Sequence, residues 1–183
     1  MKASLATISL TLLSITLSMC QSGERKSPSE RAIVEREDIS VSIDYSRPYK
    51  NDRLIFGTKE DDALVPYGKV WRTGANEATE LTITKNVTIA GNSLEAGTYS
   101  LYTIPGEKEW TIAINSRTDY WGRGLIGSPF KDKQDVFRFT APVQPLEEVQ
   151  EQFLIKLEHG ADGPIDAILR WDKTHVQFEI IPE

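Results

Sequence analysis

The segment Ile39-Ser40-Val41-Ser42-Ile43-Asp44-Tyr45 shows the pattern that decides the fold of this chain. Its apolar or aromatic residues alternate with polar ones at every second position. Successive side chains of an extended strand point to opposite faces, so this alternation predicts a strand with one face buried and the other in water. The same period of two recurs at residues 81–84, 110–115, 136–141, 153–158 and 175–180.

Turn-forming residues separate these strands at short intervals, for example at Pro105-Gly106 and Asp162-Gly163-Pro164. The best helical candidate, residues 146–152, covers barely two turns. Tyr99 follows Gly97 in a pattern typical of a tyrosine corner, in which the hydroxyl ties down a crossover loop. We therefore predict an all-β fold, an antiparallel β-sandwich of roughly ten short strands, with little or no helix outside an N-terminal signal peptide.

The composition excludes several classes of protein. A chain of 183 residues suits one domain, and 21 Lys and Arg against 27 Asp and Glu give a net charge of −6. This acidic balance argues against a nucleic-acid partner, which binds a basic surface. A single cysteine excludes an intramolecular disulfide and a Cys-rich zinc site.

Two further patterns carry no chemistry that we can assign. Residues 122–127 match the glycine pattern of a dinucleotide site, but no helical period follows them, so we predict no nucleotide partner. His159 and His175 have no accompanying catalytic or metal-binding motif, and we expect both at the protein surface. We predict no metal site and no cofactor.

The N-terminus has the features of a targeting segment. Lys2 precedes an apolar run from Leu5 to Leu17, which is too short to cross a membrane. The run ends in Leu17-Ser18-Met19-Cys20, which resembles a bacterial lipoprotein box, with Met19 where a smaller residue is usual. This resemblance implies cleavage before Cys20 and acylation of its thiol, which would attach the chain to a membrane. The alternative is a plain signal peptide, with Cys20 incidental.

These features divide the chain into three parts. We expect a lipoprotein signal peptide at residues 1–19, the acylated Cys20 with a polar, flexible tether at residues 20–38, and a single β-sandwich domain at residues 39–183. Gln21 stands where the inner-membrane lipoproteins of enterobacteria have Asp. We therefore expect a lipid-anchored protein of the cell envelope, at the outer membrane.

The densest group of polar and aromatic residues lies between Val65 and Glu77. An indole can stack on a ring, a guanidinium can hold an anion, and an amide or carboxylate can bind hydroxyl groups. Glu77 is also the one plausible general acid or base of this segment. The candidate ligand-binding residues are Arg47, Trp71, Arg72, Asn76, Glu77 and Trp121. The structural alternative is a core Trp beside an Arg–Glu pair that fastens a loop.

Several longer motifs resemble one known family. They are Asp44-Tyr45-Ser46-Arg47-Pro48, the segment from Val65 to Glu77, Ala96-Gly97-Thr98-Tyr99-Ser100-Leu101, Trp110-Thr111, Asn115 and Trp121-Gly122. In this order they are similar to domain of unknown function 2911, a family common among envelope proteins of Bacteroidota. The resemblance implies a secreted or lipid-anchored single domain. It implies no activity and no catalytic residues.

Three hypotheses for the function follow. The first is a non-catalytic, lipid-anchored domain that binds a glycan, an envelope polymer or another partner. The second is a carbohydrate-active enzyme that uses Glu77 with a second carboxylate. Glu80 is nearest in sequence, but along an extended strand its side chain would face away from Glu77. The third is a purely structural envelope lipoprotein.

Overall fold

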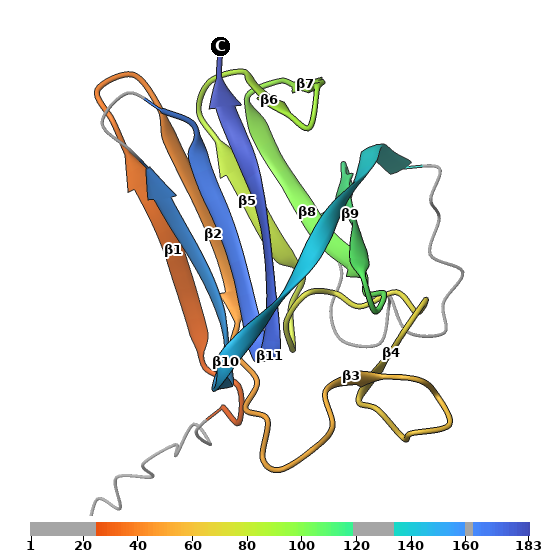
Figure 1. The fold of residues 1–183 in the computed structure, drawn as a ribbon. Coiled ribbons are helices and arrows are strands. Elements are labelled where there is room, and N and C mark those ends of the chain that lie inside the picture. Colours follow the sequence, from red (N-terminus) through yellow and green to blue (C-terminus); the bar gives the residue numbers. More distant parts are fainter. Residues whose placement is uncertain (1–24, 119–133, 160–162) are drawn as a thin grey trace, which may run out of the picture.

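A computed structural model of the chain describes residues 25–118, 134–159 and 163–183 (Figure 1). These residues form eleven β-strands and no α-helix, which confirms the prediction of an all-β fold. None of the described segments is a helix of the length and apolar character that a membrane span requires. The strands are β1 (Ser29–Glu35), β2 (Ser40–Ser46), β3 (Phe56–Gly57), β4 (Val65–Pro66), β5 (Thr79–Ile83), β6 (Val87–Ile89), β7 (Asn92–Leu94), β8 (Gly97–Ile104), β9 (Glu109–Asn115), β10 (Asp135–His159) and β11 (Ile165–Pro182).

Nine of the strands form one continuous antiparallel sheet in the order β1-β2-β5-β8-β9-β10-β11-β6-β7. The period-two pattern sets the register. Ile43 of β2 lies opposite Leu81 of β5, so both apolar side chains point to the core, while Asp44 lies opposite Glu80 on the other face. Strands β3 and β4 form a small parallel pair outside this sheet.

Two long strands fold the sheet back on itself. The first part of β10, up to Pro142, pairs with β9, and the part from Val143 onward pairs with β11. The β10–β11 register shifts between Pro145 and Leu154, where bulges bend the ladder. Figure 1 shows β10 running from the upper right to the lower left in cyan, then turning upward in blue beside β1. These long, bent strands correct the expectation of uniformly short ones, and residues 146–152, the best helical candidate, lie within β10.

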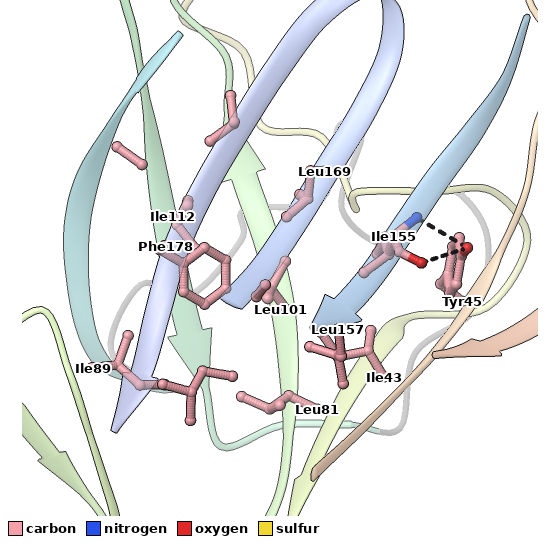
Figure 2. Close-up of a cluster of buried hydrophobic side chains, with 14 of the residues drawn as sticks. Ile43, Tyr45, Leu81, Ile89, Leu101, Ile112, Ile155, Leu157, Leu169 and Phe178 are labelled. Atoms are coloured by element: carbon pink, nitrogen blue, oxygen red, sulfur yellow. Dashed lines mark hydrogen bonds between the residues drawn. The ribbon is translucent and has the colours of Figure 1, made fainter. Parts of the chain in front are cut away.

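The folded sheet encloses a core of aliphatic and aromatic side chains. Ile43, Leu81 and Leu101 come from one half of the sheet and pack in one cluster with Leu169 and Phe178 from the other (Figure 2). Burial of such side chains stabilises the fold by about 1.5–3 kcal/mol each. Five further rings pack face or edge together at the end of the sheet where β10 bends; they are Phe56, Trp71, Trp110, Phe153 and Trp171.

The Tyr45 hydroxyl joins the two halves of the folded sheet. It accepts a hydrogen bond from the Ile155 amide at 2.9 Å and donates one to the Ile155 carbonyl at 3.1 Å (Figure 2). Tyr45 is 4% exposed, so these bonds lie in the interior. The expected tyrosine corner is a separate feature, because the Tyr99 hydroxyl donates to the carbonyl of Glu95 at 3.0 Å.

The structure corrects the expected boundary of the tether. Residues 29–35 are strand β1, which pairs with β2 from Ser29 opposite Ser46 to Glu35 opposite Ser40. This strand has few buried residues because it lies at one end of the sheet order, with Ile33 46% exposed and Val34 7% exposed. Its weak apolar period explains why the sequence pattern indicated a polar tether here.

His175 is also not at the surface, because it is 7% exposed. Arg170 donates from Nε to His175 Nδ1 at 3.0 Å, which leaves Nε2 to donate to the Gln177 side chain at 3.3 Å. Burial lowers the pKa of His175, and the charge of Arg170 lowers it further, against an opposing effect of Gln177. The imidazole is therefore a neutral interior group.

We expect the substitution Tyr45→Phe to lower the free energy of unfolding by about 1–3 kcal/mol, because it leaves a buried amide and a buried carbonyl without partners. Tyr99→Phe is the matched control. It removes an exposed hydroxyl bond, so its cost should be about 0.5 kcal/mol. Urea denaturation of both variants measures the difference, and equal losses would contradict the role assigned to Tyr45.

Candidate ligand-binding site

Trp71 lies mainly in the core, as the structural alternative predicted. It is 5% exposed, and its ring stacks on Trp171 with centroids 5.6 Å apart and an angle of 21° between the planes. Its indole nitrogen donates to the Gly74 carbonyl at 3.1 Å, and its backbone pairs with Thr103. Only a small part of Trp71 reaches the surface, where it forms the floor of a pocket.

The segment after Trp71 is held in a compact loop. Thr73 and Asn76 have positive φ angles of 59° and 57°. A Cβ atom at Gly74 would lie 2.9 Å from the carbonyl oxygen of Ser46, so only glycine permits this approach of the two backbones. The Thr79 hydroxyl donates to the Thr73 carbonyl at 2.8 Å. These constraints fix the directions of Arg72, Asn76 and Glu77.

Asn76 and Glu77 hold the N-terminal segment against this loop. Arg25 forms an ion pair with Glu77 at 2.6 Å, and the Asn76 amide donates to the Ser27 carbonyl at 3.1 Å. The pKa of Glu77 lies below its ordinary value. Partial burial, the largest single effect, raises that pKa, but bonds from its own amide, Arg25 and Ser46, with the charge of Arg25, together outweigh it.

Arg47 holds β10 in a similar way. Its Nε donates to the Phe153 carbonyl at 3.0 Å, and Nη1 lies 3.3 Å from a carboxylate oxygen of Glu30. Arg47, Asn76 and Glu77 therefore all make contacts within the protein. Cys20 and Trp121, the other two predicted site residues, lie outside the described residues, as does the glycine pattern at residues 122–127.

Arg72 lines a pocket of about 350 Å³, named here the basic pocket. Three cations line it, Lys26, Arg53 and Arg72, and no carboxylate does. Arg53 donates to the carbonyls of Lys50 and Tyr49, and Arg72 donates from Nη1 to the Asn76 carbonyl at 2.8 Å. The remaining lining residues are Ser27, Pro48, Tyr49, Asn51, Leu64, Val65, Trp71, Gly74, Ala75 and Trp171.

A second pocket, of about 270 Å³, is named here the acidic pocket. Like the basic pocket, it is lined by residues of the N-terminal segment and of the segment that follows Trp71. Its lining residues are Ser29, Glu30, Asp44, Tyr45, Ser46, Glu77, Ala78 and Glu80. Arg31 forms a two-pronged pair with Asp44 at 2.6 and 2.8 Å. Burial raises the pKa of Glu80, and the charge of Asp44 raises it further.

Glu77 and Glu80 thus line one pocket, contrary to the expectation that their side chains face apart. That expectation assumed an extended strand through both residues. Strand β5 begins only at Thr79, and the two residues between the glutamates, Ala78 and Thr79, are both buried, so the alternation of faces is broken there. Among the described residues, no group of three or more His, Cys, Asp or Glu side chains is arranged to hold a metal ion.

Sequence reasoning missed a third polar group, centred on Asp135. Its carboxylate accepts hydrogen bonds from the Tyr102 hydroxyl at 2.7 Å, Asn115 at 2.8 Å and Arg138 at 2.6 Å. Burial, followed by the bond to Asp135, raises the pKa of Tyr102. The ladder places Asn115 opposite Asp135, a pairing that becomes predictable only once the β9–β10 register is known. This group fastens β8, β9 and β10 together.

We expect Glu77→Gln to lower the free energy of unfolding at neutral pH by about 0.5–1 kcal/mol, because water screens its half-exposed ion pair with Arg25. The folded pKa is depressed, so this stabilisation is present above the ordinary Glu pKa of about 4.3 and is lost as pH falls through the folded value. Denaturation at a series of pH values should show the wild-type and variant stabilities converging in acid. Glu60→Gln, on an exposed loop, is the control; a difference that persists in acid would contradict the ion-pair account.

Comparisons with known proteins agree with the motifs found in the sequence. Residues 27–180 match the model of a family described as protein of unknown function (DUF2911). Neither the curated proteins nor the solved structures contain a significant match. The match begins two residues before β1, in agreement with a folded domain that includes this strand. Because it covers most of its length, the chain belongs to the DUF2911 family of proteins of unknown function.

Proposed function

We propose that the chain is a lipid-anchored protein of the bacterial cell envelope that binds an anionic ligand in the basic pocket. The observation that carries this proposal is the lining of that pocket by Lys26, Arg53 and Arg72 with no carboxylate among its residues. A guanidinium offers a planar pair of donors that matches a carboxylate or a phosphate. All the charged residues that line this pocket are cations, in a chain of net charge −6.

The other lining residues support an acidic glycan or a similar envelope polymer as the ligand. Tyr49 is 40% exposed at the rim, where its ring can pack on a sugar. Asn51 offers an amide for hydroxyl groups. A volume of about 350 Å³ is at the small end of ligand sites, so it suits one or two rings of a longer molecule.

The proposed location rests on the N-terminal sequence. The apolar run before Cys20 and the leucine three residues before it support export and acylation. Gln21 favours the outer membrane. Membership of the DUF2911 family supplies no activity, so the pocket carries the functional proposal by itself.

Calorimetric titration with oligogalacturonate, an acidic saccharide, and with neutral maltooligosaccharides tests the binding proposal. We expect only the acidic saccharide to bind, with an affinity that falls as salt is added. Arg53→Gln should weaken binding about tenfold, as expected for loss of a charged hydrogen bond. Lys26→Gln should act in the same direction without disturbing the turn that Arg53 supports.

Lys85→Gln is the matched control, because Lys85 pairs with Asp38, between β1 and β2, and lines neither the basic pocket nor the hollow beside it. Equal binding of neutral and acidic saccharides, or a loss of affinity in the Lys85 variant as large as in the Lys26 variant, would contradict the basic pocket as the site. Absence of any ligand would favour the purely structural alternative.

One observation favours a second candidate function, a carbohydrate-active enzyme at the acidic pocket. Glu77 and Glu80 line that pocket, and their pKa values are shifted in opposite directions. Paired carboxylates with separated pKa values are the arrangement that glycoside hydrolysis uses. Glu80 would donate a proton to the leaving oxygen, and the ionised Glu77 would act as base or nucleophile.

Release of reducing ends from envelope polysaccharides tests this second function. We expect Glu80→Gln and Glu77→Gln each to reduce the rate by at least about 100-fold, the typical loss of a general acid or base. Activity should be highest between the two pKa values, where Glu77 is ionised and Glu80 protonated. Arg117→Gln, remote from the pocket in sequence and absent from its lining, is the control. Unchanged hydrolysis in both Glu variants would exclude this function.

A further inference from the structure

The folded domain begins only a few residues after Cys20. Arg25 is paired with Glu77, the Ser27 carbonyl accepts a bond from Asn76, and the Pro28 carbonyl accepts one from the Arg47 amide at 2.9 Å. Arg25 lies five positions after Cys20. Even in a fully extended chain, this step of five positions spans at most about 18 Å. An acyl group on Cys20 would therefore keep this end of the domain close to the membrane surface.

The basic pocket lies at this same end. Lys26 and Ser27 line it directly, and Arg25, Lys26, Pro28, Ser29 and Tyr49 line an adjoining surface hollow. In Figure 1 the described chain starts at the bottom of the view, near the loops that join β2 to β5, while the C-terminus lies at the top. The pocket and the point of attachment thus share one end of the molecule.

Two of the segments that line the basic pocket are basic, although the whole chain is acidic. Residues 25–28 and 47–53, which both contribute to the pocket, contain five Lys or Arg residues and one Asp. Arg25, Arg47 and Lys50 form ion pairs with Glu77, Glu30 and Asp172. Among the described residues, Lys26 and Arg53 have no carboxylate partner, so their charges remain available to an external anion.

We infer that the basic pocket faces the membrane to which the chain is anchored and takes the phosphate group of an anionic lipid headgroup. This inference rests on the proposed anchor and on the proposed anion pocket, and it names a membrane lipid, in place of the acidic glycan, as the source of the anion. The short link to Cys20 limits how far the pocket can move from the lipid surface. The cations of Lys26, Arg53 and Arg72 match a phosphate in charge and in hydrogen-bond donors.

Vesicle sedimentation tests the headgroup specificity. The chain from residue 20 onward, carrying Cys20→Ser so that no acyl group is present, is mixed with vesicles of phosphatidylcholine alone or with added phosphatidylglycerol. We expect partition only onto the anionic vesicles. Lys26→Gln and Arg53→Gln should each reduce it about fivefold, the effect of one cation at an anionic surface, and Lys85→Gln should leave it unchanged. An equal loss in the Lys85 variant would overturn the inference, because it would indicate general charge attraction.

Fluorescence quenching on the acylated chain tests the orientation. The chain has one natural cysteine, Cys20, whose thiol is blocked when acylated, so Leu64→Cys and Lys85→Cys each introduce one reactive thiol. Leu64 is 44% exposed and lines the basic pocket. Lys85 follows the end of β5, which points to the top of Figure 1, away from the start of the described chain. With a quencher on the lipid headgroups, we expect a label at position 64 to be quenched several times more than one at position 85. Equal or reversed quenching would overturn the inference.

The outcomes separate this inference from the proposed function. A chain that binds oligogalacturonate or glycerol phosphate in solution but ignores anionic vesicles retains the anion pocket and refutes the lipid headgroup. A chain that binds neither the soluble anions nor the vesicles refutes both.

Discussion

The bonds between the Tyr45 hydroxyl and the backbone of Ile155 belong to a line of contacts that joins residues 45–50 to residues 151–155 of β10. The closed fold depends on this line of contacts, which is named here the seam. In the sheet order, β2 and β10 are separated by β5, β8 and β9, so the ladder does not join them. Three further contacts continue the seam, from Arg47 to the Phe153 carbonyl, from the Phe153 amide to Pro48, and from the Lys50 amide to Glu151. Each satisfies a backbone group that folding removes from water. The seam therefore closes the sheet over the aromatic core without extending the ladder.

The same seam positions both pockets. Residues 47–53 include part of the seam and continue from it, and they form one wall of the basic pocket. The N-terminal segment lies beside it, held by the Arg47 amide and by Asn76 and Glu77. Lys26 and Gly74 line the basic pocket, whereas Ser29 and Ala78 line the acidic one. The segments 26–29 and 74–78 therefore each contribute to both pockets. Arg47, Asn76 and Glu77 thus shape the site chiefly by holding these segments in place.

The sequence pattern predicted most of the strands because each buries one face and so alternates strictly. The pattern gave wrong predictions where a strand buries little of either face or where it bends. Strand β1 lies at the end of the sheet order and buries little, so it resembled a polar tether. The bends of β10 and β11 arise from bulges and from the positive φ of Asp172, which a two-residue period does not encode. Of the candidate site, the sequence located Arg72 and Glu77. It missed Lys26 and Arg53, because only the tertiary seam brings residues 25–28 and 47–53 together.

Net charge and local charge lead to different expectations for an anchored protein. A chain of net charge −6 is repelled by an anionic membrane when it diffuses freely. Screening limits that repulsion to a Debye length of about 8 Å at physiological ionic strength. With the proposed anchor at Cys20, five positions before Arg25, the N-terminal end of the domain would be the part held nearest to the membrane. The sign of the charge at that end would then determine the orientation of the domain relative to the membrane. Here that end carries Lys26 and Arg53, and the neighbouring carboxylates of Glu30 and Glu77 are already paired with Arg47 and Arg25.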